Sequence, residues 1–233
     1  MIEVYFYPSP NGLKVTICLE ELEVPFRVVT IDITRGAQFE PSFLALSPNN
    51  KIPALIDARQ VPPVRLFESG AILLYLAERA GRFIPTTPTA RADCLAWLFW
   101  QVGGLGPMAG QAHHFRAFAS EQVPYGIKRY TDECNRLYGV LNRQLAQHEW
   151  VAGEYSIADM ACYPWIIPHE RQGQDLAAFP HLARWYTAMG ERPAVQRGLV
   201  HGHERAADSV GHTFLYGQTA ANVEQRSADR EPE

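Results

Sequence analysis

Residues 5–21 read YFYPSPNGLKVTICLEE, and this stretch decides the fold of the first part of the chain. An apolar, aromatic run typical of a strand leads into the turn PSPNG at 8–12, and helical periodicity follows at once. In many redox and transfer enzymes a turn of this kind holds a cysteine whose thiolate the helix start stabilises. Here the turn offers the Ser9 hydroxyl, the Asn11 amide and backbone N–H groups, but no thiol.

The rest of the first third alternates between strand and helix patterns. Apolar and β-branched runs predict strands, and a period of about 3.6 residues predicts helices between and after them. The predicted strands cover residues 4–7, 26–31, 52–57 and 64–67, and the predicted helices cover 13–22, a short piece within 36–46, and 68–80. This order describes an α/β domain, a compact mixed sheet with helices on it.

Strand patterns stop after residues 81–89, GRFIPTTPT, which are typical of a linker. Helical periodicity continues over 91–100, 125–147, 156–166 and 180–189. Ser156 and Asp159 have the spacing of a capping box. The glycine-rich residues 103–110, GGLGPMAG, lack the GxGxxG spacing and the preceding strand of a nucleotide loop, so we interpret them as a helix kinked around Pro107.

Four regions follow from these patterns. We expect an α/β domain at 1–81, a linker at 82–90, an all-helical domain at 91–200 and a polar, partly mobile tail at 201–233. Within the tail, residues 214–216 could dock on the body of the protein.

Composition narrows the expected partners and location. The chain has 233 residues, with 47% hydrophobic and 20% charged residues and a net charge of −4. It has no basic patch interleaved with aromatic residues, so we expect no nucleic-acid partner. No apolar run approaches the roughly 18 residues of a membrane span, and residues 1–4 begin in a strand pattern without the basic start of a signal peptide. We therefore expect a cytoplasmic protein that does not insert into membranes.

Neither a disulfide framework nor a metal site is expected. The four cysteines, at 18, 94, 134 and 162, are scattered and form no CxxC pair. Cys18 shares a helical stripe with Val15, Leu19 and Leu22, which is typical of a buried apolar face. His113 and His114 are neighbours that point in different directions on a helix, and His201 and His203 lie in the expected tail.

Ser9 and Asn11 form the first candidate site segment. The N–H groups of a helix start lack partners and carry partial positive charge, so they stabilise an anion. If that anion is a thiolate, a nearby hydroxyl and amide lower the thiol pKa further and raise its reactive fraction. The alternative is that Ser9 or Asn11 simply caps the helix.

Residues 50–54, NKIPA, form the second segment. A cis bond between Ile52 and Pro53 would turn the N–H and C=O groups of Ile52 outward, where a peptide-like ligand can pair with them. A trans proline at a strand start is the alternative, and the sequence does not separate the two.

The third segment is FESG at 67–70. The Glu68 carboxylate can accept from an ammonium, and the Ser69 hydroxyl can donate to a carboxylate, so together they suit the zwitterionic head of an amino acid. An ordinary helix cap with a dipole-favourable glutamate is the alternative. A hydrolase of the Ser/His/Asp type fits poorly because Ser9 lacks a GxSxG elbow.

These segments together resemble a cytosolic glutathione transferase. The likeness rests on SPNG at 9–12, NNKIP at 49–53, FESGAILLYLAE at 67–78, the linker and the helical half. More narrowly, the stretches FLALSPNNKIPAL (43–55), LFWQVGGLGPMAGQAHHF (98–115), PYGIKRY (124–130) and YSIADMACYPW (155–165) resemble the bacterial nu-class members. That class consists of glutathione-dependent disulfide-bond reductases and is similar to the yeast nitrogen-regulator prion domain. The resemblance covers about residues 1–200.

The resemblance implies a thioredoxin-like N-terminal domain, a helical C-terminal domain and a homodimer, with glutathione in the cleft between the domains. It implies contacts to the thiol from Asn11 and to the glycyl end from Gln38. It also implies contacts to the peptide backbone from Lys51, Ile52 and a cis Pro53, to the γ-glutamyl head from Glu68 and Ser69, and one from Arg129 in the helical domain. Nu-class members usually carry threonine where this chain has Ser9, which leaves open whether Ser9 or Asn11 is the leading catalytic group.

The sulfur would then arrive with glutathione, as two molecules per site or as the oxidised disulfide. The expected activity is reduction of small disulfides, with transfer to electrophiles or peroxide reduction as secondary activities. The open alternatives are a binding module without turnover and a glutathione-dependent isomerase or dehalogenase.

Overall fold

A computed structural model describes residues 1–203 and 218–229 of the chain. Two compact units are present: one holds Met1–Ile72 and the described residues that follow Arg197, and the other holds Leu73–Arg197. Each unit has its own buried apolar core.

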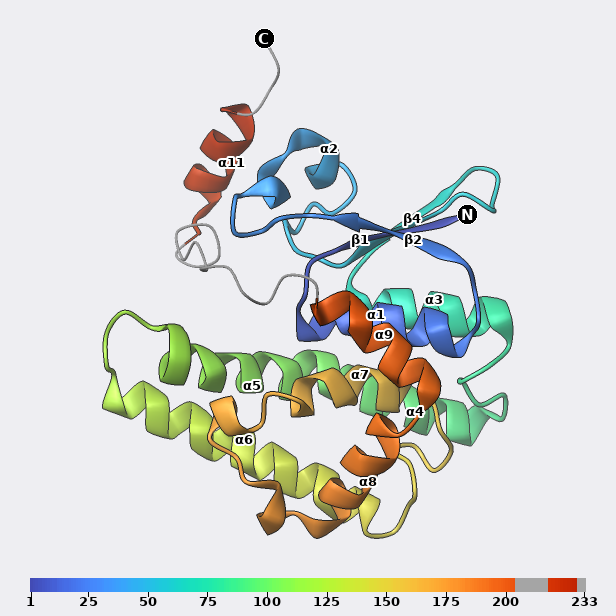
Figure 1. Ribbon diagram of the computed structural model, residues 1–233, viewed down its shortest axis with the longest axis vertical. Helices are drawn as coiled ribbons and strands as arrows, with labels where there is room; N and C mark the ends of the chain where they lie inside the picture. Colours follow the sequence, from blue (N-terminus) through green and yellow to red (C-terminus); the bar gives the residue numbers. More distant parts are fainter. Residues whose placement is uncertain (204–217, 230–233) are drawn as a thin grey trace. The chain divides into compact units, whose positions relative to one another are not determined.

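The first unit is built on a mixed four-stranded sheet (Figure 1). Its strands are β1 (Ile2–Phe6), β2 (Phe26–Thr30), β3 (Ala54–Asp57) and β4 (Val64–Phe67), in the order β2-β1-β3-β4. Strand β1 runs parallel to β2 and antiparallel to β3, and β3 runs antiparallel to β4. The mixed α/β class expected from the sequence is therefore confirmed.

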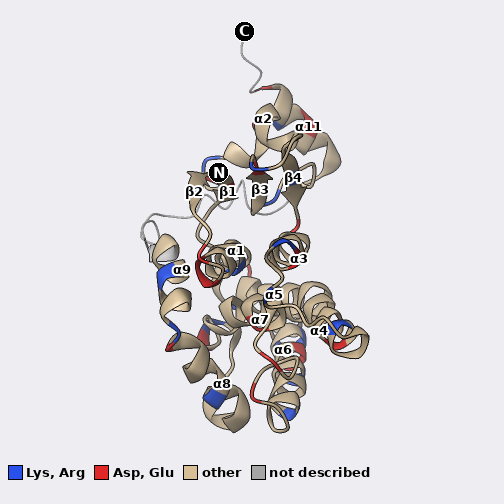
Figure 2. Cartoon of the chain, turned by 90° about the vertical axis from the view of Figure 1, so that its right-hand side faces the viewer, with Lys and Arg blue, Asp and Glu red and all other residues tan. Residues whose placement is uncertain are grey.

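Helix α1 (Pro10–Glu21) covers one face of this sheet (Figure 2). The side chains of β1 alternate, and Ile2, Val4 and Phe6 are buried. A Cβ atom on Gly12 would lie 2.6 Å from the Phe6 ring and 2.8 Å from the Tyr7 carbonyl oxygen. The turn between β1 and α1 therefore requires glycine at this position, because any side chain would collide with the strand that precedes it.

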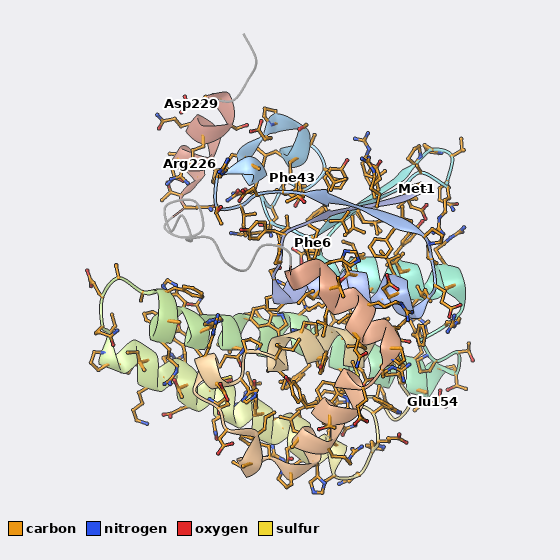
Figure 3. All side chains as sticks on the ribbon, in the orientation of Figure 1. Met1, Phe6, Phe43, Glu154, Arg226 and Asp229 are labelled. Atoms are coloured by element: carbon orange, nitrogen blue, oxygen red, sulfur yellow. The ribbon has the colours of Figure 1, made fainter. Side chains whose placement is uncertain are left out.

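The other face carries α2 (Pro41–Leu44), which follows a 3₁₀ turn at Ala37–Phe39 (Figure 2). Phe43 packs in a cluster with Ile31, Leu46 and Ala54, and its ring centroid lies 6.4 Å from that of Tyr5. Phe6 and Phe43 thus fill the cores on opposite sides of the sheet (Figure 3).

Helix α3 (Ser69–Ala80) leads from the sheet into the second unit, which is helical. Its other helices are α4 (Pro88–Trp100), α5 (Gly106–His113), α6 (Pro124–Leu145), α7 (Ile157–Ile166), α8 (Pro180–Gly190) and the start of α9 (Pro193–His203). The segment interpreted as a kinked helix is a π-helical turn at Gln101–Leu105, followed directly by α5 with Pro107 in its first turn. A π-helical turn adds a residue to the helix and is a common cause of a bend.

The capping box expected at the start of α7 is present. The backbone N–H groups of Val151 and Ser156 and the indole N–H of Trp185 donate to the Asp159 carboxylate over 2.9, 3.0 and 2.8 Å. Asp159 and Ser156 are fully buried, so this carboxylate joins three parts of the helical unit.

Part of the tail expected at 201–233 is helical, although the sequence pattern did not predict a helix there. Helix α9 continues to His203, and α11 (Ala220–Ala228) is capped by Thr219. The Arg226 guanidinium lies 5.1 Å from the centre of the Phe39 ring. The suggested docking residues 214–216 lie outside the described residues.

Candidate functional site

A pocket of about 190 Å³ opens in the first unit beside the start of α1. Parts of the three segments predicted from the sequence meet in it, together with the loop before β3. The lining residues are Asn11, Ser47, Asn49, Lys51, Ile52, Pro53, Phe67, Glu68 and Ser69.

Ser9 acts as the N-cap of α1. Its backbone is extended, with φ of −155°, and its Oγ accepts from the Gly12 N–H over 3.1 Å. The capping role that the sequence left open is therefore present, while Asn11, two residues later, lines the pocket. The Ser9 hydroxyl keeps its own proton for donation, because in this bond it is the acceptor.

The peptide bond between Ile52 and Pro53 is cis, and both residues line the pocket. The loop that leads to them is held by hydrogen bonds: the Ser47 hydroxyl donates to the Lys51 carbonyl over 2.7 Å, and the Asn50 N–H donates to the Ser47 carbonyl over 2.8 Å. A ligand therefore meets a loop whose backbone is already ordered.

Lys51 provides a cation at the pocket. Its side chain is solvent-exposed, yet desolvation by surrounding protein atoms lowers its pKa. An anionic ligand group at Lys51 would oppose this shift, because it favours the charged ammonium.

Glu68 has a left-handed backbone, with φ of +70°, although it is not glycine. Its carbonyl accepts from the Ile72 N–H over 3.0 Å, so it stands at the N-terminus of α3. The Asn49 side-chain amide donates to the Glu68 carboxylate over 3.4 Å. Backbone conformations of this kind cost about 1–3 kcal/mol and concentrate at binding sites, which makes Glu68 a stronger site candidate than its sequence alone does.

Ser69, the first residue of α3, is buried with 6% of its surface exposed. The Lys14 ammonium donates to the Ser69 Oγ over 3.2 Å. Lys14 itself is 1% exposed. The sequence analysis did not identify Lys14 as a site residue. The one indication in the sequence is that this lysine stands between apolar residues of a helix that is otherwise buried.

Two residues assigned by resemblance do not line this pocket. Gln38 is buried, and its amide donates to the Ile33 carbonyl over 3.3 Å. Arg129 belongs to α6 of the helical unit, where it lines a separate pocket of about 590 Å³. In that pocket its guanidinium lies 5.9 Å from the centre of the Tyr130 ring.

No cysteine contributes to the 190 Å³ pocket. All four cysteines of the chain are free thiols and buried, as expected for Cys18. Burial raises the pKa of Cys18 and Cys94, and raises that of Cys134 to about 12. A buried thiol whose pKa is raised is a poor nucleophile at neutral pH.

Within the described ranges, no group of three His, Cys, Asp or Glu side chains has the arrangement of a metal site. The described part of the chain also contains no helix with the length and apolar character needed to span a membrane.

Chemically, the pocket combines groups of complementary kinds. The start of α1 with the Asn11 amide suits an anion, and Lys51 and Ser69 suit carboxylates. The Glu68 carboxylate suits an ammonium, and the backbone of Ile52, beside the cis Pro53, suits a peptide backbone. A small zwitterionic peptide carries all of these groups.

Comparison with known proteins agrees with this chemistry. Residues 2–78 match the glutathione S-transferase N-terminal domain model, and residues 107–193 match the C-terminal domain model. The chain is 52% identical over 204 residues to the disulfide-bond oxidoreductase YfcG of Escherichia coli, covering 86% of this chain and 95% of the relative. It is 43% identical to the disulfide-bond oxidoreductase YghU of the same organism, covering 85% of this chain and 74% of that protein.

Solved structures show the same fold. A glutathione transferase from Pseudomonas putida, with one glutathione disulfide bound per subunit, superposes with a TM-score of 0.80 at 42% identity, covering 85% of this chain and 90% of that one. A family member from Pseudomonas fluorescens with two glutathione molecules bound gives 0.80 at 41% identity, covering 85% and 92%. The mixed sheet of the first unit is thus thioredoxin-like, and the second unit is the helical domain that accompanies it in these proteins. The chain belongs to the glutathione S-transferase family.

Proposed function

We propose that this protein is a glutathione-dependent disulfide-bond oxidoreductase of nu-class type, which works as a cytosolic homodimer. One observation carries the proposal: the pocket offers partners for every charged end of a tripeptide, while every cysteine of the chain lies buried elsewhere. The reactive sulfur therefore comes from the ligand.

In this proposal Ile52 pairs with the ligand backbone beside Pro53, and Glu68 and Ser69 receive the γ-glutamyl head. Lys51 faces a carboxylate, and the sulfur lies at the start of α1 beside Asn11. The helix start and the neutral amide lower the pKa of the bound thiol. Asn11 is the leading group because it lines the pocket and Ser9 does not. Gln38 and Arg129 are assigned by family resemblance.

The reaction balances with two glutathiones. A first thiolate attacks one sulfur of the substrate disulfide, forms a mixed disulfide and releases the other sulfur as a thiolate, which takes up a proton. A second glutathione thiolate then attacks the glutathione sulfur of the mixed disulfide. Oxidised glutathione forms, and the second substrate thiol leaves. The relatives crystallised with two glutathiones or with glutathione disulfide support this two-ligand scheme.

Apolar side chains on the helical unit support the homodimer. Phe99 and Tyr125 are large residues with 63% and 75% of their surface exposed. Aromatic residues are enriched at protein interfaces relative to the rest of the surface.

The test is reduction of hydroxyethyl disulfide by glutathione, coupled to glutathione reductase. We expect Asn11→Ala to lower kcat by about tenfold or more, with a much smaller change in the dissociation constant for glutathione. A variant with all four cysteines replaced by alanine or serine, provided that it folds, should keep the activity. Loss of activity in that variant would contradict the proposal, as would an Asn11 effect confined to binding.

A protein that binds glutathione without turnover is the second candidate, because the same pocket would serve it. Retention on immobilised glutathione without reduction of any small disulfide would favour it.

A further inference from the structure

Lys14 is a charged residue inside the core of the first unit. It lies one turn after Asn11 on α1, with 1% of its surface exposed. Removing an ammonium from water costs several kcal/mol unless polar partners compensate for the loss. One such partner is the Ser69 Oγ, 3.2 Å from the Lys14 Nζ. Lys14 and Ser69 lie 55 residues apart in the sequence, so the pair links α1 to the start of α3.

The chemistry of the pair determines the direction of this hydrogen bond. An ammonium carries three donors and no acceptor, so the Ser69 oxygen must be the acceptor. A serine hydroxyl has a single proton, and this bond leaves that proton available. Because Ser69 lines the pocket, the hydroxyl can donate its proton to a ligand there.

We infer that Lys14 is a positioning residue: it holds the Ser69 hydroxyl as a donor into the pocket and adds a buried positive charge behind it. Both effects select a carboxylate at Ser69. The inference rests on the proposed function, in which that carboxylate is the α-carboxylate of the γ-glutamyl residue. With Glu68 beside it to receive the ammonium, the site recognises the zwitterionic head in a single orientation.

Lys51 does not duplicate this role. Lys51 is exposed and belongs to the loop before β3, whereas Lys14 is buried behind Ser69 on α1. Solvent screens the charge of Lys51 more strongly than that of Lys14, because a buried charge acts through a lower dielectric.

The test compares two ligands by calorimetry on the full-length protein. One is glutathione, and the other is γ-aminobutyryl-cysteinyl-glycine, which lacks the α-carboxylate. We expect Lys14→Met to weaken glutathione binding by about tenfold or more, as for loss of a charge-assisted hydrogen bond. Binding of the decarboxylated peptide should change less than about twofold. Arg79→Met removes a positive charge from an exposed site on the last turn of α3 and should change neither affinity.

Ser69→Ala should reproduce most of the loss. Lys14→Met should weaken binding less in the Ser69→Ala background than in the natural protein, because Lys14 then has no Ser69 hydroxyl to position and contributes only its charge. In turnover, KM for glutathione should rise more than kcat falls. If Lys14→Met does not fold, Lys14→Gln replaces it. Its amide oxygen can accept from the Ser69 hydroxyl and turn that proton away from the ligand.

The outcomes separate the two proposals. If Lys14→Met or Lys14→Gln weakens both ligands equally, or neither, the role given to Lys14 is wrong while the proposed function stands. If the natural protein does not bind glutathione, the proposed function fails, and the inference fails with it.

Discussion

The side-chain amide of Asn50 donates a hydrogen bond of 2.7 Å to the Oε1 of Gln218, 168 residues further along the chain. Asn50 is buried and directly precedes Lys51 in the pocket, and Gln218 directly precedes the cap of α11. The C-terminal helix is thereby attached to the loop that carries part of the binding site.

Asn50 has a left-handed backbone, with φ of +60°. We expect Asn50→Ala to lower the free energy of unfolding by about 1–2 kcal/mol more than Asn50→Gly does. Both changes remove the bond to Gln218, but only alanine adds the cost of the backbone conformation. Urea denaturation of the two variants measures the difference. Equal losses would mean that the loop relaxes into another conformation.

Glu68 lowers the stability of the fold through its backbone conformation, while its carboxylate contributes to ligand binding. Its φ of +70° is unfavourable for a residue with a side chain. Glu68→Gly should therefore unfold at a temperature equal to or above that of Glu68→Gln, which keeps the strained backbone. Both variants should bind glutathione about tenfold or more weakly, because the carboxylate that receives the ammonium is gone. Calorimetry and thermal melts test this pair, and a clearly less stable glycine variant would contradict the strain argument.

Asp159 stabilises the helical unit through a single buried carboxylate. Asp159→Ala leaves the N–H groups of Val151, Ser156 and Trp185 without their buried acceptor. We expect a loss on the order of 3–5 kcal/mol in the free energy of unfolding. Asp132→Ala is the control, because Asp132 is exposed and pairs with exposed Lys128 at 2.5 Å. That change should cost about 1 kcal/mol or less, and similar losses for the two variants would refute the assigned role of Asp159.

The pH dependence of binding reports on Lys51. Desolvation lowers the pKa of Lys51 from the usual 10.5, so its charge is lost at a lower pH than that of a fully hydrated lysine. The charged form attracts a carboxylate, and affinity should therefore fall as pH rises through the Lys51 pKa. S-methylglutathione is the suitable ligand because it has no thiol to titrate. At neutral pH the natural protein should bind this ligand more tightly than Lys51→Met, and the ratio of the two affinities should fall as the pH rises. The ligand amine titrates equally with both proteins, so it cancels in this ratio. A constant ratio of affinities from pH 7 to pH 10 would rule out this role.

The sequence by itself predicted the elements whose signals are local. The apolar, aromatic run before the PSPNG turn and the apolar stripe through Cys18 predicted the first strand and helix, and the capping-box spacing predicted the start of α7. These features depend on residues within one or two turns of each other, so a short window contains their cause. The segments around Asn11, Ile52 and Glu68 were also recognisable, because each carries polar groups beside a proline or a helix start.

Other features depend on partners far away in the chain. Burial of Lys14 needs the start of α3, docking of α11 needs Asn50 and Phe39, and the choice between Ser9 and Asn11 depends on which side chain faces the pocket. The residue type tells us that a hydroxyl or an ammonium is present, but not what surrounds it. Its role depends on which atoms the tertiary structure places within hydrogen-bonding distance and on how much water it excludes, and local sequence records neither.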